Sequence, residues 1–120
     1  MARQWWEATL TSPRAVGLPW ASMLGFIRVV TIPRLMQSPL FSHQATGYVR
    51  GWLSAPNVQI VHPGESHAQL VFGMLEELGT AGNLTTDVHL AALALEYNAE
   101  IATTDADFAR FRGLRWFNPV

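Results

Sequence analysis

Apolar residues recur along this chain in blocks whose spacing alternates between that of helices and that of strands. The stretch RQWWEATL is typical of a helix from about residue 2 to 10, which stops before Pro13. The short apolar run AVGLPW, residues 15–20, indicates a strand. Apolar positions at helical spacing follow it and end at Pro33, so a helix is predicted there.

The same alternation repeats in the middle of the chain. A helix is predicted after residue 41, with Ser42 as its cap and a stripe of apolar side chains made by Ala45, Tyr48, Val49 and Trp52. The segment VQIVHP, residues 58–63, reads as a strand. The next helix is expected to have Ser66 as its cap and Gly79 as its stop.

The last third continues with a helix over about 86–98, a strand at 100–104, a helical turn at 105–111 and a final strand at 114–119. Strands separated by helices predict a parallel sheet with right-handed crossovers. The expected fold class is therefore α/β, in one domain, since 120 residues suffice for a single core.

Composition narrows the possible functions. An apolar fraction of 49% with only 14% charged residues is that of a folded globule. The chain has no cysteine, which excludes disulfides and thiolate metal sites. Its net charge of −1 gives no strong overall field for nucleic acid. No stretch approaches a membrane span or a signal peptide, so a cytoplasmic location is expected, with no membrane partner.

Three of the nine acidic residues lie close together near the C-terminus: Asp87, Asp105 and Asp107. Asp105 directly follows a predicted strand, at the sheet edge where ligands of parallel α/β proteins bind. Asp87 falls in the first turn of a helix that is expected to start at the same edge. Carboxylates without histidine or cysteine suit Mg²⁺ or Mn²⁺, and such a cation supports phosphodiester hydrolysis.

A purely structural interpretation of the same residues stays open. An aspartate in the first turn of a helix stabilises it by about 0.3 to 1 kcal/mol through the helix dipole. Asp107 is equally suited to be the cap of the short helical turn that follows. Spacing alone does not decide between a metal site and two helix caps.

The segment TDVHLAALALEYNAEIATTDADFARFRGLRWFNP resembles the C-terminal half of a PIN domain, in particular the VapC-like ribonuclease toxins of bacterial toxin–antitoxin systems. GLPWASMLGFIRVVTIPRL and VRGWLSAPNVQIVHP resemble the middle of the same group, so the similarity runs from about residue 3 to the C-terminus. The resemblance implies a three-layer α/β/α fold with a mostly parallel sheet.

The resemblance also implies a function. Such proteins are Mg²⁺- or Mn²⁺-dependent endoribonucleases that cut RNA such as tRNA or rRNA loops, and a cognate antitoxin neutralises them. By matching position, Asp87 and Asp105 are implied to be metal ligands, Asp107 a further ligand or water-positioning residue, and Thr104 a supporting hydroxyl. A homodimer is expected as well.

Two departures from the family pattern are visible. The first strand of the family, which ends in a metal-binding aspartate, has no counterpart, so the natural polypeptide is expected to start upstream. No acidic residue occurs between Ala8 and Gly64, where these toxins often have a glutamate. The alternative function is therefore a catalytically inactive PIN remnant that binds antitoxin or dimerises, and a phosphatase-like hydrolase ranks last.

The remaining polar and aromatic residues are interpreted structurally. The four histidines show no metal-ligand spacing and are expected at the surface or as caps: His43, His62, His67 and His89. The five tryptophans suit a core or a subunit interface better than base stacking. Arg28, Arg34 and Arg50 are favoured as solvated residues over phosphate contacts.

Overall fold

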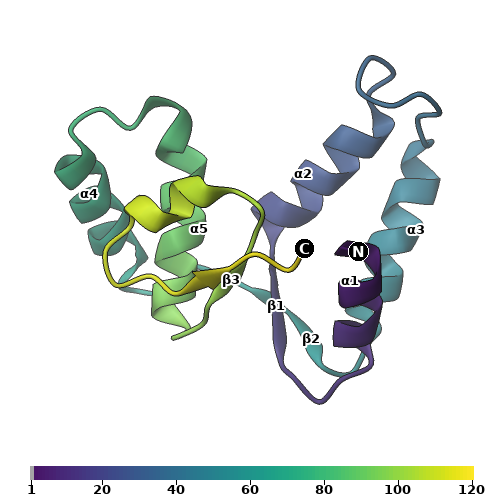
Figure 1. Cartoon of the computed structure of the whole chain (residues 1–120), viewed down its shortest axis with the longest axis horizontal. Helices are drawn as coiled ribbons and strands as arrows, with labels where there is room; N and C mark the ends of the chain where they lie inside the picture. Colours follow the sequence, from purple (N-terminus) through teal and green to yellow (C-terminus); the bar gives the residue numbers. More distant parts are fainter. Residues whose placement is uncertain (1) are drawn as a thin grey trace. The chain divides into compact units, whose positions relative to one another are not determined.

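The computed structural model describes residues 2–120 and confirms the α/β class, with helices and parallel strands alternating along the chain (Figure 1). The chain forms two compact units. We call Trp6–Val61 the middle unit, and residues 2–5 with His62–Val120 the C-terminal unit. The first helix, α1 (Ala2–Leu10), has the predicted bounds.

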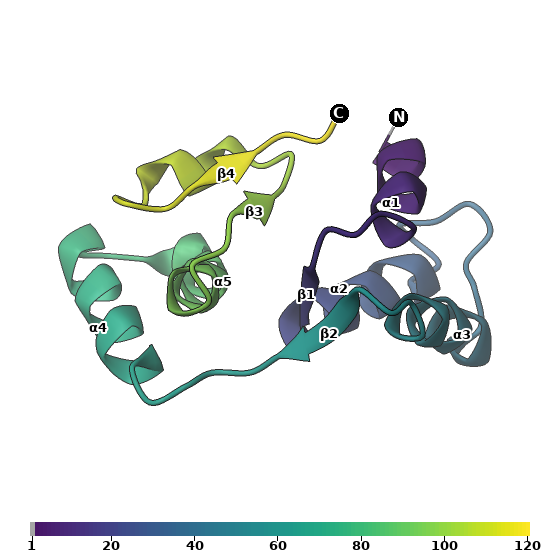
Figure 2. The ribbon, with the colours of Figure 1, turned by 90° about the horizontal axis from the view of Figure 1, so that it is seen from below.

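The strands pair in parallel, as predicted, and they form two separate pairs. In the middle unit β1 (Val16–Pro19) pairs with β2 (Val58–Val61). In the C-terminal unit β3 (Ile101–Ala102) lies beside β4 (Trp116–Phe117) (Figure 2). The last two strands are both shorter than predicted, and β3 is followed directly by a loop in which Thr103 Oγ1 accepts from the backbone N–H of Asp105. The three-layer arrangement stays a prediction.

Two helices cover the strands of the middle unit, α2 (Trp20–Thr31) and α3 (Ser42–Leu53), and they pack against each other. Met23 of α2 and Ala45 of α3 are buried. The ring of Trp52 meets two other aromatic rings edge-on, with centroid distances of 4.7 Å to Phe26 and 5.7 Å to Trp6. These contacts confirm the expected packing role for Trp6 and Trp52.

The C-terminal unit is built on α4 (His67–Leu78) and α5 (Thr85–Glu96), which pack side by side (Figure 1). A short 3₁₀ helix, η1 (Gly82–Leu84), leads into α5, and another, η2 (Ala106–Arg110), follows β3. The core of this unit joins α5 to η2 through four buried side chains, Val88, Ala91, Phe108 and Phe111. Burial of these apolar groups is what fixes η2 against α5.

Of three predicted helix ends, Gly79 and Ser66 occupy the predicted positions and Ser42 does not. Gly79 ends α4 with a φ of 77°, a left-handed conformation that suits glycine. Ser42 is the first helical residue of α3 and not its cap. Phe41 takes that position, and its backbone N–H donates to Gln44 Oε1 at 2.9 Å. Ser66 occupies the cap position of α4, but its hydroxyl makes no capping hydrogen bond.

No helix within residues 2–120 has both the length and the apolar character that crossing a membrane requires.

Phe108→Ala is expected to lower the free energy of unfolding by about 3 to 5 kcal/mol, because the ring is 4% exposed and its removal leaves a cavity. Phe72→Ala, at a site that is 60% exposed, is the matched control and should cost under about 1 kcal/mol. Urea unfolding followed by circular dichroism measures both. Equal losses in the two variants would contradict the assigned core.

Candidate metal centre

Asp105 is held by the loop that joins β3 to η2. Its backbone N–H donates to Thr103 Oγ1 at 3.0 Å, and its own Oδ1 accepts from the backbone N–H of Asp107 at 2.9 Å. Asp105 is therefore the N-cap of η2, and Asp107 lies in the first turn. The cap that the structural interpretation gave to Asp107 belongs to Asp105, since only a residue before the helix can accept from its free N–H groups.

Asp87 lies in the first turn of α5, as predicted. Thr85 Oγ1 donates to the carbonyl of Gly82 at 2.8 Å, which stabilises the entry into this helix. Val88 and Ala91 on the buried face of α5 are fully enclosed and set the rotation of the helix. The Asp87 carboxylate is thereby left half-buried at the start of the helix.

The three aspartates meet at one place. Each offers a carboxylate oxygen, and these three oxygens all lie within 4.8 Å of one another. Asp87 is half-buried, whereas Asp105 and Asp107 are exposed. Asp105 and Asp107 follow Asp87 by 18 and 20 residues in the sequence. They lie close to it in space because η2 packs on α5.

The carboxylates repel one another. Partial burial raises the pKa of Asp87 above its ordinary value of 3.8, and the negative charges of Asp105 and Asp107 raise it further. Arg110 lies close to the cluster, with its Nε 3.6 Å from Asp107 Oδ1. Because both side chains are more than half exposed, this ion pair is screened by solvent and offsets little of the repulsion.

The donor set fits a hard divalent cation. Oxygen ligands from carboxylates suit Mg²⁺, Mn²⁺ or Ca²⁺, and the cluster contains no nitrogen or sulfur ligand that would favour a softer metal. A cation at this place would also remove the repulsion that raises the pKa of Asp87. The helix-cap role of Asp105 is compatible with this fit, because a cap uses only one of its oxygens.

Thr104 is exposed, and its hydroxyl has no hydrogen bond within the part of the chain that is described. The neighbouring Thr103 instead accepts the hydrogen bond from the Asp105 backbone. Sequence reasoning missed Thr103, although a hydroxyl two residues before an aspartate is a common way of fixing such a turn. The role of Thr104 stays a prediction.

A second polar group in the C-terminal unit was also missed. His67 Nδ1 lies 2.6 Å from Glu96 Oε1, and His67 Nε2 lies 2.9 Å from His89 Nδ1. The second oxygen of Glu96 accepts from the backbone N–H of Gly64 at 2.8 Å. The expectation of surface or capping histidines is therefore wrong for His67 and His89.

These hydrogen bonds link His67, at the start of α4, to His89 and Glu96 on α5. Partial burial lowers the pKa of His89, nearby His67 lowers it further, and Glu96 opposes both. A signal was present in the sequence, since His89 and Glu96 are seven residues apart and so share one face of a helix. The partner on α4 came from tertiary packing, which spacing does not reveal.

The arginines weighed as phosphate contacts, Arg28, Arg34 and Arg50, are all exposed and belong to the middle unit. The acidic cluster belongs to the C-terminal unit. A role for these arginines beside the cluster stays an untested alternative to solvation.

Comparison with known proteins gives consistent matches. The sequence profile of the PIN domain family matches residues 2–114. Ribonuclease VapC33 of Mycobacterium tuberculosis is 44% identical over 119 residues, which make up 99% of this chain and 83% of that protein. Ribonucleases VapC37 and VapC43 of the same species are 40% and 41% identical, and the alignments cover 97% and 95% of this chain and 81% and 78% of theirs. The matched region includes all three aspartates.

Asp87→Asn should stabilise the metal-free chain at pH 7, by less than about 1 kcal/mol because the site is partly solvated. Since the pKa of Asp87 is raised on folding, the folded chain binds this proton more tightly than the unfolded chain does. The free energy of unfolding of the wild type therefore falls as the pH rises from below 3.8 through the raised pKa. The asparagine variant should not show that loss.

Urea unfolding in metal-free buffer at pH 3 and at pH 7 measures this difference. The gain of the variant over the wild type should be present at pH 7 and shrink at pH 3, where Asp87 is protonated. A gain that grows towards acid pH would show that the three carboxylates do not repel one another.

Proposed function

The chain belongs to the PIN domain family, and we propose that it is a metal-dependent endoribonuclease that acts as the toxin of a toxin–antitoxin pair. The observation that carries the proposal is the meeting of three carboxylate oxygens within 4.8 Å. Relatives at 40% to 44% identity over nearly the whole chain are named ribonucleases. The reaction is hydrolysis of RNA phosphodiester bonds, by water, in the cytoplasm.

Asp87, Asp105 and Asp107 are proposed to hold Mg²⁺ or Mn²⁺. When bound, such a cation stabilises negative charge on the phosphate oxygens and lowers the pKa of water. The chain's own part is positioning: the hydrogen bonds of Asp105 to Thr103 and Asp107 fix its carboxylate at the start of η2. Thr104, exposed beside Asp105, is proposed to support the site through its hydroxyl.

A cognate antitoxin protein and a second copy of the chain are the proposed protein partners. The middle unit exposes large apolar side chains on and beside α2 and α3, which suit a protein interface. Six of them are about half exposed or more: Trp20, Leu24, Val29, Leu35, Phe41 and Tyr48. The acidic cluster would attract a basic side chain of an antitoxin segment. Structured tRNA or rRNA loops are the proposed substrates.

Nothing in the described structure or in the comparisons favours the inactive alternative. A protein without catalytic activity would have no need to keep the carboxylates of Asp87, Asp105 and Asp107 close together against their mutual repulsion. A bound cation would relieve this repulsion, which supports the enzyme over the remnant.

Asp105→Asn should reduce both Mn²⁺ affinity and RNA cleavage by at least about a hundredfold. The change removes the charge of a proposed metal ligand, which costs more than changing a residue that only hydrogen-bonds to a ligand. The fold should be kept, since asparagine caps a helix as well as aspartate does. Glu65→Gln removes the same charge from an exposed site outside the cluster and is the matched control.

Isothermal calorimetry measures Mn²⁺ binding, and cleavage of a single-stranded RNA pool measures activity. The proposal is contradicted if the wild-type chain binds no divalent cation and cuts no RNA. Cleavage that survives equally in Asp105→Asn and Glu65→Gln would show that another part of the chain is responsible.

A further inference from the structure

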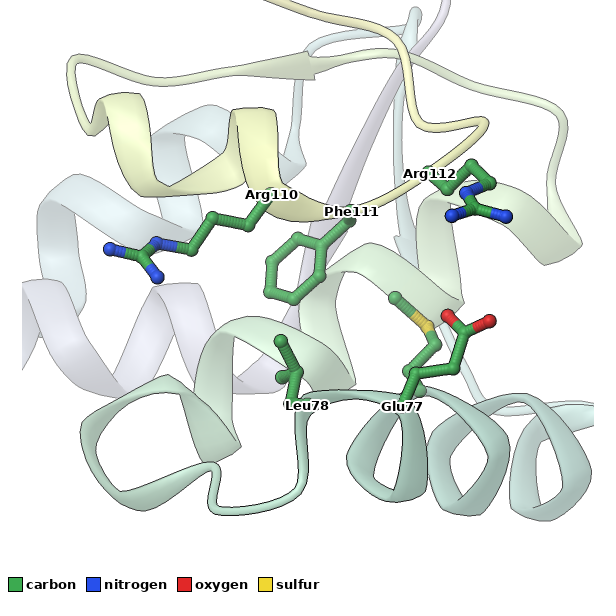
Figure 3. Close-up of a pocket in the computed structure, with 6 residues that line it drawn as sticks. Glu77, Leu78, Arg110, Phe111 and Arg112 are labelled. Atoms are coloured by element: carbon green, nitrogen blue, oxygen red, sulfur yellow. The ribbon is translucent and has the colours of Figure 1, made fainter.

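A pocket of about 290 Å³ lies between the C-terminal end of α4 and the segment that follows η2 (Figure 3). Phe111 and Leu78 form an apolar floor together with Met74. Arg110 and Arg112 lie on either side of the Phe111 ring, and the carboxylate of Glu77 points towards Arg112 (Figure 3). The pocket thus combines an apolar surface, two guanidinium groups and one carboxylate.

The pocket adjoins the acidic cluster. Arg110 lines the pocket and also pairs with Asp107, whose oxygen is one of the three that meet. A guanidinium has five N–H donors, so Arg110 can keep Asp107 as a partner and still donate to a phosphate. Arg112 is exposed and has no ion pair within residues 2–120, so its donors are available. An RNA phosphate at the acidic cluster would place the next nucleotide beside these arginines.

Glu77 is in an electrostatically unfavourable position in its own helix. It lies in the last turn of α4, which has no basic residue, and the helix dipole disfavours a negative charge there. It is exposed and makes no hydrogen bond or ion pair within the described chain. A carboxylate at the wall of a pocket is an acceptor for N–H donors of a ligand.

We propose that this pocket is a nucleotide subsite that binds one unpaired guanine next to the bond that is cut. The proposal rests on the proposed ribonuclease function and deepens it. The guanine base would lie on the apolar floor, its N1–H and N2–H groups would donate to the two oxygens of Glu77, and Arg110 and Arg112 would contact the adjoining phosphates. A volume of about 290 Å³ is sufficient for one base.

The chemistry of the pocket favours guanine over the other bases. Only guanine presents two adjacent N–H donors on its Watson–Crick edge, which match a carboxylate in a bidentate contact. Uracil, cytosine and adenine present one donor beside acceptors that the carboxylate would repel. The edge is accessible only in a base that is not paired, so single-stranded loops are the expected substrates.

The test uses the full chain with Mn²⁺ and a random single-stranded RNA pool, whose cut ends are sequenced. Guanine should be enriched at one fixed position relative to the cut, and Glu77→Gln should reduce that enrichment about tenfold. Arg112→Ala should lower kcat/KM about threefold or more for all sequences and leave the preference unchanged. Glu65→Gln, the same change as Glu77→Gln at an exposed glutamate outside the pocket, should alter neither.

A binding measurement without catalysis separates this inference from the nuclease proposal. Fluorescence anisotropy in EDTA compares an eight-nucleotide RNA that carries one guanine with the same RNA carrying inosine, which lacks the N2 amino group. Wild type should bind the guanine RNA several-fold more tightly, and Glu77→Gln should bind both equally.

Each result has one meaning. Guanine-dependent binding without any cleavage supports the subsite and overturns the nuclease proposal. Cleavage with no preferred guanine, and equal binding of both RNAs, overturns the subsite alone. If Glu77→Gln and Arg112→Ala leave every RNA measurement unchanged, the subsite is overturned and the pocket is assigned to a protein contact.

Discussion

The repulsion between three carboxylates is the constraint on which the C-terminal unit depends. Oxygens of Asp87, Asp105 and Asp107 lie within 4.8 Å of one another, an arrangement that like charges do not adopt unless other contacts hold it. The opposing force is the burial of Phe108 and Phe111, which fixes η2 on α5. A hydrophobic contact thus keeps together a set of charges that repel.

The short helix η2 therefore serves several purposes at once. Its first turn carries Asp107, its buried face carries Phe108, and its last residue, Arg110, lines the neighbouring pocket. Five residues of 3₁₀ helix connect the core, the acidic cluster and the pocket, so small shifts of this segment would move all three together. The hydrogen bonds among His67, His89 and Glu96 connect α4 to α5. These two helices contact η2 and contribute to the pocket.

Much of this arrangement could be predicted from the sequence. Apolar spacing gave the bounds of α1 and α2 closely, and the placement of Asp105 just after a strand predicted its approach to Asp87. What spacing could not give were contacts that arise only when helices pack. The hydrogen bond between His67 and His89 is one example, and the pocket beside Glu77 is another. Strand ends were also missed, because side-chain hydrogen bonds such as that of Thr103 end β3 earlier than its apolar pattern does.

The double use of Asp105 has an evolutionary consequence. One of its oxygens completes η2 by capping it, and the other is left for a different partner. Aspartate and asparagine codons differ by a single nucleotide, and asparagine would preserve the cap while removing the charge. On the proposed function, a single point mutation would therefore give a chain that keeps its fold and has lost a metal ligand. Loss of toxicity in such a lineage need not begin with loss of structure.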